Sequence, residues 1–505
     1  GAAAAAASAG GDNFYTHQID NSVRMTAPSS TSADNARLTR TVGTVDSNVH
    51  WTLNFWIKRS AIEGNNPVSS ARPLDVFTPR SGTSGSVLHE FQFGATGSYG
   101  AGDAFAITNT NTGAYIISTN NLFRDTSAWY NIHIQADLDN GTASEKLKIF
   151  VNGTEASYNV DNRSSYTSFA GMVAGNWTIG DYYNYGYPLQ SYLAQFCFID
   201  GTTYAASDFG ETKNGVWIPK DPSGLTFGSE GYLLKFESSS DLGNDSSGNN
   251  NDWSSSNLGT HDQMLDSPTF DSSSNGGNFA TLNPLASLAG ITFTEGNLKE
   301  ADNNSGWQSA WSTMAAKSGK FYFEAEYTTS ARDRGYIGVA QTKDLAIHQD
   351  SYYAGQTNNS AGWYSANGSV YINASTTGTT LNTYTTGDIL GCAIDIDNGY
   401  VYFSKNGTWE DSGDPASGSS GTGGFSLSGS TTGDPWHLIV SNWGAQFIVN
   451  YGQEGTFAGS VTAGGNSDTN GYGNFKYSVP SGYSALCTGA LPIDDEIDPA
   501  QTDDN

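Results

Sequence analysis

Basic residues are scarce in this 505-residue chain: 22 Lys and Arg face 50 Asp and Glu, which gives a formal net charge of −28. Proteins that bind nucleic acids or anionic membranes use clusters of Lys and Arg, so this balance argues against both classes of partner. The sequence also lacks any run of 18 consecutive apolar residues, and we therefore expect no membrane insertion.

Residues that carry common catalytic and metal chemistry are few and dispersed. Cys197, Cys392 and Cys487 lie far apart within apolar runs and form no CxxC pair, which indicates buried thiols rather than a disulfide framework or a zinc site. The seven histidines form no HExxH motif, and neither a GxSxG elbow nor a P-loop occurs. Residues 12–236 contain no Glu-x-Asp-x-x-Glu run, which could place a glycosidase pair on one strand face. We therefore expect no enzyme.

Aromatic residues and glycine are abundant instead. Tyr, Phe and Trp make up 12% of the chain, and there are 60 glycines. Short alternating runs such as Trp51–Ile57, Lys146–Val151 and Tyr400–Ser404 end at Gly, Asn, Asp or Ser, whereas helical periodicity is almost absent. Asn152-Gly153 and Asn406-Gly407 follow two of these runs and favour type I′ hairpin turns. The pattern predicts a mostly β protein built from antiparallel sheets.

Five segments in the first half of the chain resemble, in order and spacing, the concanavalin A-like, laminin-G-like jelly roll. They are WTLNFWIKR at 51–59, WYNIHIQAD at 129–137, LKIFVNG at 147–153, WTIGD at 177–181 and LAQFCFIDG at 193–201. The resemblance implies two packed antiparallel sheets, whose concave face or rim loops often bind sugars, in some members with calcium.

Segments of the second half resemble the SPRY domain, a second kind of β-sandwich. They are GKFYFEAEY at 319–327, RGYIGVAQ at 334–341, GWYSANGSVYIN at 362–373, GDILGCAIDIDNGYVYFSKNGTW at 387–409 and NYGQ at 450–453. The central hairpin of the family, a hydrophobic strand followed by Asp-Asn-Gly and then Tyr-Phe-Ser-Lys-Asn-Gly, is present almost whole. The resemblance implies a recognition module without catalytic chemistry.

The pairing of the two sandwiches is similar to virion surface proteins of tailed bacteriophages, especially marine ones. The segments that carry this resemblance are DSSGNNNDW at 245–253, DSPTF at 266–270 and FKYSVPSGYSALCTGALP at 475–492. It implies a place on the virion surface, at the tail or the capsid exterior, contacts with other virion proteins, and a homotrimer.

The fold class predicted is therefore mostly β, with two antiparallel β-sandwiches joined by an Asn/Ser/Gly-rich bridge. Composition shifts mark the boundaries, because Ser, Asn, Asp and Gly dominate from Ser238 to Asn278. The expected parts are an Ala/Gly-rich attachment segment at 1–11, a laminin-G-like jelly roll at 12–236, a polar bridge with short strands at 237–318, a SPRY-like sandwich at 319–458 and a C-terminal extension with an acidic tail at 459–505.

Two aromatic clusters supply the candidate ligand-binding residues. The first is a segment between two expected strands and comprises Asp181, Tyr182, Tyr183, Tyr185 and Tyr187. The second accompanies the SPRY-like strands and comprises Tyr352, Tyr353, Trp363 and Tyr364. Aromatic faces stack on sugar rings, and the same composition suits protein recognition. The alternative for either cluster is that its rings pack inside a sandwich or at a subunit interface.

One acidic loop could hold calcium, the single cofactor that the sequence suggests. Its candidate ligands are Asp241, Asp245, Asn249, Asn251 and Asp252. Hard oxygen ligands at this density suit calcium, although their spacing fits no EF-hand. The alternative is a connector in which the side-chain oxygens cap backbone amides, and the residue pattern favours that alternative.

Together these observations predict non-catalytic adhesion: a tail fibre or spike of a tailed phage that binds a host surface glycan or protein. Several copies on one particle would multiply weak individual contacts. Three alternatives stay open, namely a capsid-attached fibre or decoration protein, a polysaccharide depolymerase built on the jelly roll, and a bacterial surface adhesin.

Overall fold

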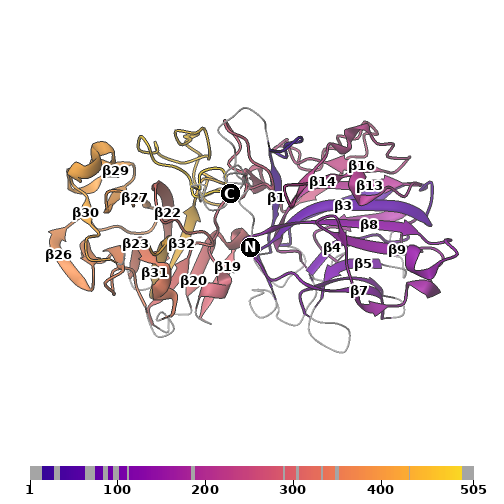
Figure 1. Ribbon diagram of the computed structural model, residues 1–505, viewed down its shortest axis with the longest axis horizontal. Helices are drawn as coiled ribbons and strands as arrows, with labels where there is room; N and C mark the ends of the chain where they lie inside the picture. Colours follow the sequence, from indigo (N-terminus) through magenta and orange to yellow (C-terminus); the bar gives the residue numbers. More distant parts are fainter. Residues whose placement is uncertain are drawn as a thin grey trace, which may run out of the picture. The chain divides into compact units, whose positions relative to one another are not determined.

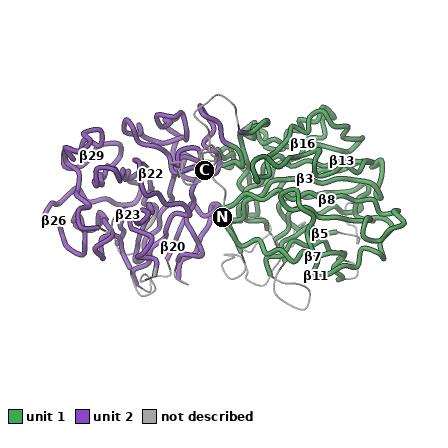
Figure 2. Tube along the Cα trace, in the orientation of Figure 1, with its two compact units in different colours: residues 1, 15–269 green, residues 2–14, 270–505 purple. Residues whose placement is uncertain are grey.

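The computed structural model describes residues 14–27, 34–62, 74–82, 89–94, 102–110, 113–182, 188–287, 290–302, 306–330, 334–346, 352–430 and 433–491. The expected attachment segment at 1–11 and the acidic tail lie outside these residues. The described residues divide into two compact units (Figure 2): unit 1 is Tyr15–Thr269, and unit 2 is Phe14 with the residues from Phe270 onward. Strands dominate both units (Figure 1), and the prediction of a mostly β protein with antiparallel sheets is confirmed.

Unit 1 contains two eight-stranded antiparallel sheets and a small hairpin. Sheet 1 has the order β10 (Thr154–Glu155), β9 (Leu147–Val151), β8 (Trp129–Asp137), β3 (His50–Arg59), β13 (Ser191–Asp200), β1 (Ser22–Met25) and β18 (Gln263–Met264), with β16 (Tyr232–Leu234) also paired to β13. Sheet 2 has the order β11 (Tyr158–Asp161), β7 (Ala114–Leu122), β6 (Ala104–Asn109), β5 (His89–Phe93), β4 (Leu74–Thr78), β12 (Gly175–Ile179), β2 (Arg37–Val42) and β17 (Ser254–Ser256). The hairpin joins β14 (Gly210–Lys213) to β15 (Val216–Pro219).

Large apolar side chains from the two sheets of unit 1 meet in one core. Phe77 of sheet 2 lies 6.0 Å from Phe196 of sheet 1, and Trp177 lies edge-on to Phe198 at 5.1 Å, measured between ring centroids. All four rings are fully buried. Burial of each such ring stabilises the fold by about 1.5–3 kcal/mol, so this core holds the two sheets face to face as a β-sandwich.

Unit 2 is built from an eight-stranded and a six-stranded antiparallel sheet. Sheet 3 has the order β19 (Ile291–Thr294), β20 (Lys299–Asp302), β32 (Ala445–Asn450), β22 (Lys320–Ser330), β27 (Ile389–Asp395), β28 (Tyr400–Lys405) and β29 (Thr408–Trp409), with β30 (Phe425–Ser426) paired to β28. Sheet 4 has the order β21 (Gln308–Trp311), β31 (Trp436–Asn442), β23 (Gly335–Gln341), β24 (Ser360–Tyr364), β25 (Ser369–Ile372) and β26 (Ser375–Thr380). Trp363 of sheet 4 lies 5.9 Å from Phe403 of sheet 3, so the two sheets share a core.

Turns and short helical segments connect the strands. The hairpin turns at Asn152-Gly153 and Asn406-Gly407 have positive φ at both residues, as the predicted type I′ geometry requires. The 3-10 turns are Ala143–Glu145, Arg163–Ser165, Ala206–Asp208, Pro222–Gly224, Thr260–Asp262, Pro284–Ala286, Glu295–Asn297, Thr342–Ala346, Glu410–Ser412 and Pro415–Ser420. Within the described ranges, no helix has the length and apolar character needed to cross a membrane.

Residues of the expected polar bridge at 237–318 contribute strands to both units. Strands β17 and β18 extend the sheets of unit 1, whereas β19, β20 and β21 belong to the sheets of unit 2. Trp253, from the same polar stretch, is buried against Tyr232 at 5.0 Å. The three cysteines are buried free thiols, as predicted.

Candidate functional site

The first predicted aromatic cluster is described only at its beginning. Tyr183, Tyr185 and Tyr187 lie outside the described residues, and Tyr182 is half-buried. Asp181 is fully buried and not offered at the surface, and a ligand-binding role for it stays a prediction. Its carboxylate accepts a hydrogen bond from Asn35 Nδ2 at 3.2 Å and lies 3.9 Å from the Arg37 guanidinium. These contacts hold the Asp181 carboxylate inside unit 1.

The second predicted cluster divides between the interior and the outer face of unit 2. Tyr352 and Trp363 are buried, at 3% and 0% exposure, which agrees with the alternative that rings of this cluster pack inside the sandwich. Tyr353 and Tyr364, their neighbours in the chain, are half-buried. Successive residues of a strand point to opposite faces, which is why Trp363 enters the core while Tyr364 does not.

Five rings on the outer face of sheet 4 form a cluster that we call the aromatic platform. Its members are Trp307, Tyr336, Tyr353, Tyr364 and Tyr371. Tyr336 lies at the centre, stacked on Tyr364 at 4.7 Å and on Tyr353 at 4.9 Å. Trp307 contacts all three rings at 5.1–5.8 Å, and Tyr371 lies edge-on to Tyr336 at 5.9 Å.

The platform is a neutral, partly exposed π surface. Tyr336 is 3% exposed and the other four rings are half-buried. Burial raises the pKa of the Tyr336 phenol and of the Tyr353 phenol, so both stay protonated at neutral pH. Next to the platform, the Arg334 guanidinium lies 4.3 Å above the ring of Trp443, which is 6.2 Å from Trp307. The arrangement can stack on an apolar ring face or on a planar group.

Strand register explains how the platform forms. Tyr336 of β23 is paired directly with Tyr364 of β24, and Tyr371 of β25 is paired with Gly362 of β24. Gly362 and Tyr364 are two residues apart on β24 and therefore face the same side of the sheet. Cross-strand partners also face the same side, so Tyr336, Tyr364 and Tyr371 share one face. Sequence reasoning found Tyr353 and Tyr364 but missed Trp307, Tyr336 and Tyr371, because only the pairing of strands brings these residues together.

Unit 1 carries a separate surface, which we call the polar groove. It has a volume of about 490 Å³ and lies along β12, β2, β17 and the residues just before β17. Its lining residues are Arg37, Thr39, Arg40, Thr41, Asn176, Trp177, Thr178, Asn250, Asp252, Ser254 and Ser256. Register places Thr39 between Thr178 and Ser254, and the Thr41 hydroxyl donates to Asn176 Oδ1 at 3.0 Å. Hydroxyl and amide groups at this density suit a ligand that is itself rich in hydroxyls.

Comparison with known proteins identifies part of unit 2. The SPRY domain family matches residues 320–425, which hold β22 to β29 and all four platform tyrosines. Residues 320–425 form a SPRY domain. Solved structures similar to this chain include the SPRY domain of human HERC1 (15% identity, 33% of this chain and 96% of that chain, TM-score 0.27). Others are a human SPRY domain (16%, 32% and 94%, 0.23) and the TRIM65 PSpry domain (12%, 34% and 91%, 0.25).

The predicted calcium loop of unit 1 is held by its own hydrogen bonds. Asp245 Oδ1 accepts from the backbone amides of Leu233 and Ser247, at 2.9 and 2.8 Å. Its Oδ2 accepts from the backbone amide of Asn251 at 2.9 Å, and Asp252 Oδ1 accepts from the backbone amide of Asp245 at 2.8 Å. These oxygens cap backbone amides, as in the alternative connector arrangement. Calcium binding by this loop stays a prediction.

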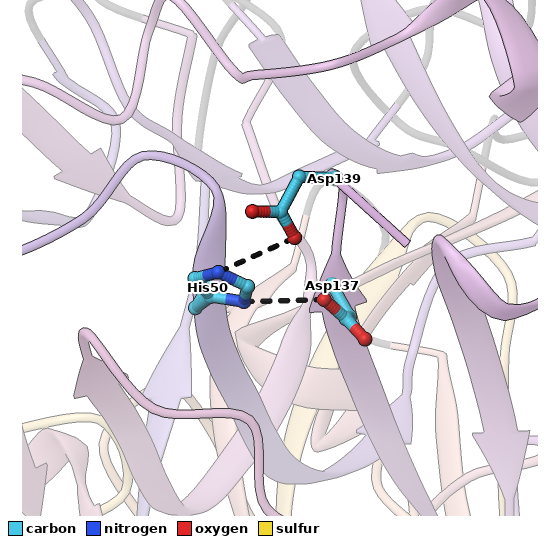
Figure 3. Close-up of side chains that lie close together, drawn as sticks. All are labelled: His50, Asp137 and Asp139. Atoms are coloured by element: carbon cyan, nitrogen blue, oxygen red, sulfur yellow. Dashed lines mark ion pairs between the residues drawn. The ribbon is translucent and has the colours of Figure 1, made fainter. Parts of the chain in front are cut away.

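A histidine and two aspartates lie together on the surface of unit 1 (Figure 3). His50 Nδ1 is 3.2 Å from Asp137 and His50 Nε2 is 3.4 Å from Asp139, so the ring lies between the two carboxylates. Imidazole with two carboxylates is a donor set that zinc and related metals accept. The sequence search missed this group because the pairing of β3 with β8 brings His50 opposite Asp137.

Proposed function

We propose that the chain is a non-catalytic adhesion protein that binds a surface glycan through the aromatic platform around its SPRY domain. The observation that carries this proposal is the stack of the half-buried Tyr353 and Tyr364 on the buried Tyr336, with Trp307 against it. Such rings offer flat apolar area to the C–H face of a sugar at little cost in side-chain entropy. Neutral phenols next to that face can hydrogen-bond the sugar hydroxyls.

The polar groove supports the same class of ligand independently. Its hydroxyl and amide side chains can exchange hydrogen bonds with a saccharide, and its volume lies within the range of small-molecule sites. A chain with two surfaces of this kind can contact one polysaccharide at two places, which multiplies weak affinities.

The resemblance to tailed-phage proteins supports a place on a virion. In this proposal the first sandwich is a laminin-G-like jelly roll, and the chain is a homotrimeric tail fibre or spike attached to other virion proteins. Immunogold microscopy of lysate from the source, with antibody against this chain, tests the location. Label at the tail is expected; label over the capsid would indicate a capsid fibre or decoration protein, and label on cells alone would contradict a virion.

Substitution of platform rings should remove glycan binding without unfolding the protein. On a microarray of bacterial surface polysaccharides, we expect Tyr353→Ala and Tyr364→Ala each to weaken binding roughly tenfold or more, because each removes a stacking face. Tyr477→Ala is the matched control, since this half-buried tyrosine packs beside Ile389 and Ile448 of sheet 3.

Three results would decide between the two surfaces. Loss of binding in the platform variants alone supports the proposal. Loss only in Asn176→Ala, in the polar groove, would move the ligand to unit 1. Equal binding by the wild type and by both sets of variants would contradict both surfaces as glycan sites.

A further inference from the structure

The outer face of sheet 2 carries a patch of polar side chains on four neighbouring strands, which we call the buried polar patch. Its members are Asp75, Thr78, Glu90, Gln92, Thr108 and Thr178. Asp75 is paired with Gln92 across β4 and β5, Thr78 with Thr178 across β4 and β12, and cross-strand partners share a face. Phe91, between Glu90 and Gln92, points into the core.

Oxygen atoms of this patch are buried without partners. Asp75 is 0% exposed and Gln92 is 3% exposed. Within the described part of the chain, no hydrogen bond reaches Asp75 Oδ1 or Oδ2, Gln92 Oε1, Thr78 Oγ1 or Thr178 Oγ1. Glu90 Oε2 accepts from the Thr108 hydroxyl at 2.7 Å. Buried polar groups almost always have hydrogen-bond partners in native proteins. Several buried side-chain oxygens without partners on one face therefore indicate a bound group that coordinates oxygen atoms.

Electrostatics strengthen this expectation. A buried carboxylate without a partner is costly, and two more carboxylates, Glu90 and Asp181, lie close enough to Asp75 to disfavour its charge. Burial, Glu90 and Asp181 together raise the pKa of the Asp75 carboxyl well above its usual range. A cation among these groups would remove the repulsion and coordinate the free oxygens at the same time.

We propose that the buried polar patch is a binding site for a hard divalent cation of the calcium class, ligated by Asp75, Gln92 and Glu90. Carboxylate, amide and hydroxyl oxygens are the donors that calcium prefers, and its flexible coordination tolerates a site spread over neighbouring strands. The site differs from the Asp241–Asp252 loop, where the oxygens of Asp245 already accept hydrogen bonds. The proposal does not depend on glycan binding.

Calorimetric titration of the EDTA-treated full chain with CaCl2 tests the site directly, and thermal unfolding gives a second readout. We expect heat of binding and a midpoint for unit 1 that rises by roughly 5–10 °C at a hundredfold excess over the dissociation constant. Asp75→Asn should abolish both signals. Without cation, this variant should melt no lower than the wild type, because asparagine is nearly the same size as aspartate and has no carboxyl group that must stay uncharged in this buried position.

Matched variants keep the test decisive. Asp241→Asn and Asp139→Asn each remove one exposed carboxylate of unit 1 and should leave both signals unchanged. Gln92→Ala should weaken calcium binding at least tenfold, and it replaces Asp75→Asn if that variant fails to fold. Absence of heat and of a midpoint shift with both CaCl2 and MgCl2 would overturn the proposal. So would a signal that survives in Asp75→Asn, or one that is lost in Asp241→Asn or Asp139→Asn.

Discussion

Replacement of Asp266 by alanine is expected to lower the free energy of unfolding of unit 1 by about 3–5 kcal/mol. The Asp266 carboxylate accepts from Lys58 Nζ at 2.7 Å and from the Trp129 indole at 2.9 Å. Its backbone carbonyl accepts from the Ser22 hydroxyl at 2.6 Å. Lys58 is 0% exposed, so alanine at position 266 would strand a charged group away from water.

Urea denaturation of the full chain, followed by tryptophan fluorescence and fitted as two transitions, measures the effect. Glu237→Ala is the matched control, because Glu237 is exposed and lies 3.7 Å from the half-buried Lys235, and loss of this pair should cost less than about 1 kcal/mol. The double variant Lys58→Met with Asp266→Leu should recover most of the lost stability, since it removes both charges. A change in Asp266→Ala as small as that of the control would contradict a buried ion pair.

The role of Asp266 shows where sequence reasoning reached its limit. The alternation of residues in Trp51–Ile57 and Tyr400–Ser404 predicted strands that the structure contains, although both faces of these two strands are buried. Asp266 lies in the stretch dominated by Ser, Asn, Asp and Gly, whose composition is typical of a connector. Composition does not reveal that one of its acids pairs with a buried lysine on another strand.

The candidate sites were predictable to different degrees. Tyr353 and Tyr364 stand out as aromatic residues beside expected strands, but period-two alternation was needed to separate Tyr364 from Trp363. Asp75 and Glu90 escaped a search for carboxylates on one strand, because they lie on neighbouring strands and only the register of sheet 2 brings them together. The local sequence pattern predicts strands and which of their residues share a face. A site that spans several strands can be predicted only when the pairing of those strands is known.

The stability of unit 2 should fall as pH rises from about 4.5 to about 8, because Glu300 is protonated in the folded state. Glu300 is fully buried on β20, and its Oε2 accepts a hydrogen bond from Asn442. Burial, reinforced by Asp302, raises the pKa of Glu300 from 4.5 to about 8. The folded state therefore holds a proton that the unfolded state releases above pH 4.5. This contribution to stability is complete below pH 4.5 and is lost by pH 8, and it amounts to roughly 3–5 kcal/mol.

Glu300→Gln isolates this contribution from other titrating groups of unit 2. Burial also raises the pKa of Glu324 to about 7, with the same sign, and lowers that of His437 to about 4, with the opposite sign. The difference in unfolding free energy between Glu300→Gln and wild type cancels both. That difference should shift in favour of the variant as pH rises from 5 to 8, because glutamine keeps the shape without an ionisable proton. The exposed control Asp411→Asn should show no such trend, and a pH-independent difference for Glu300→Gln would mean that Glu300 is ionised in the folded protein.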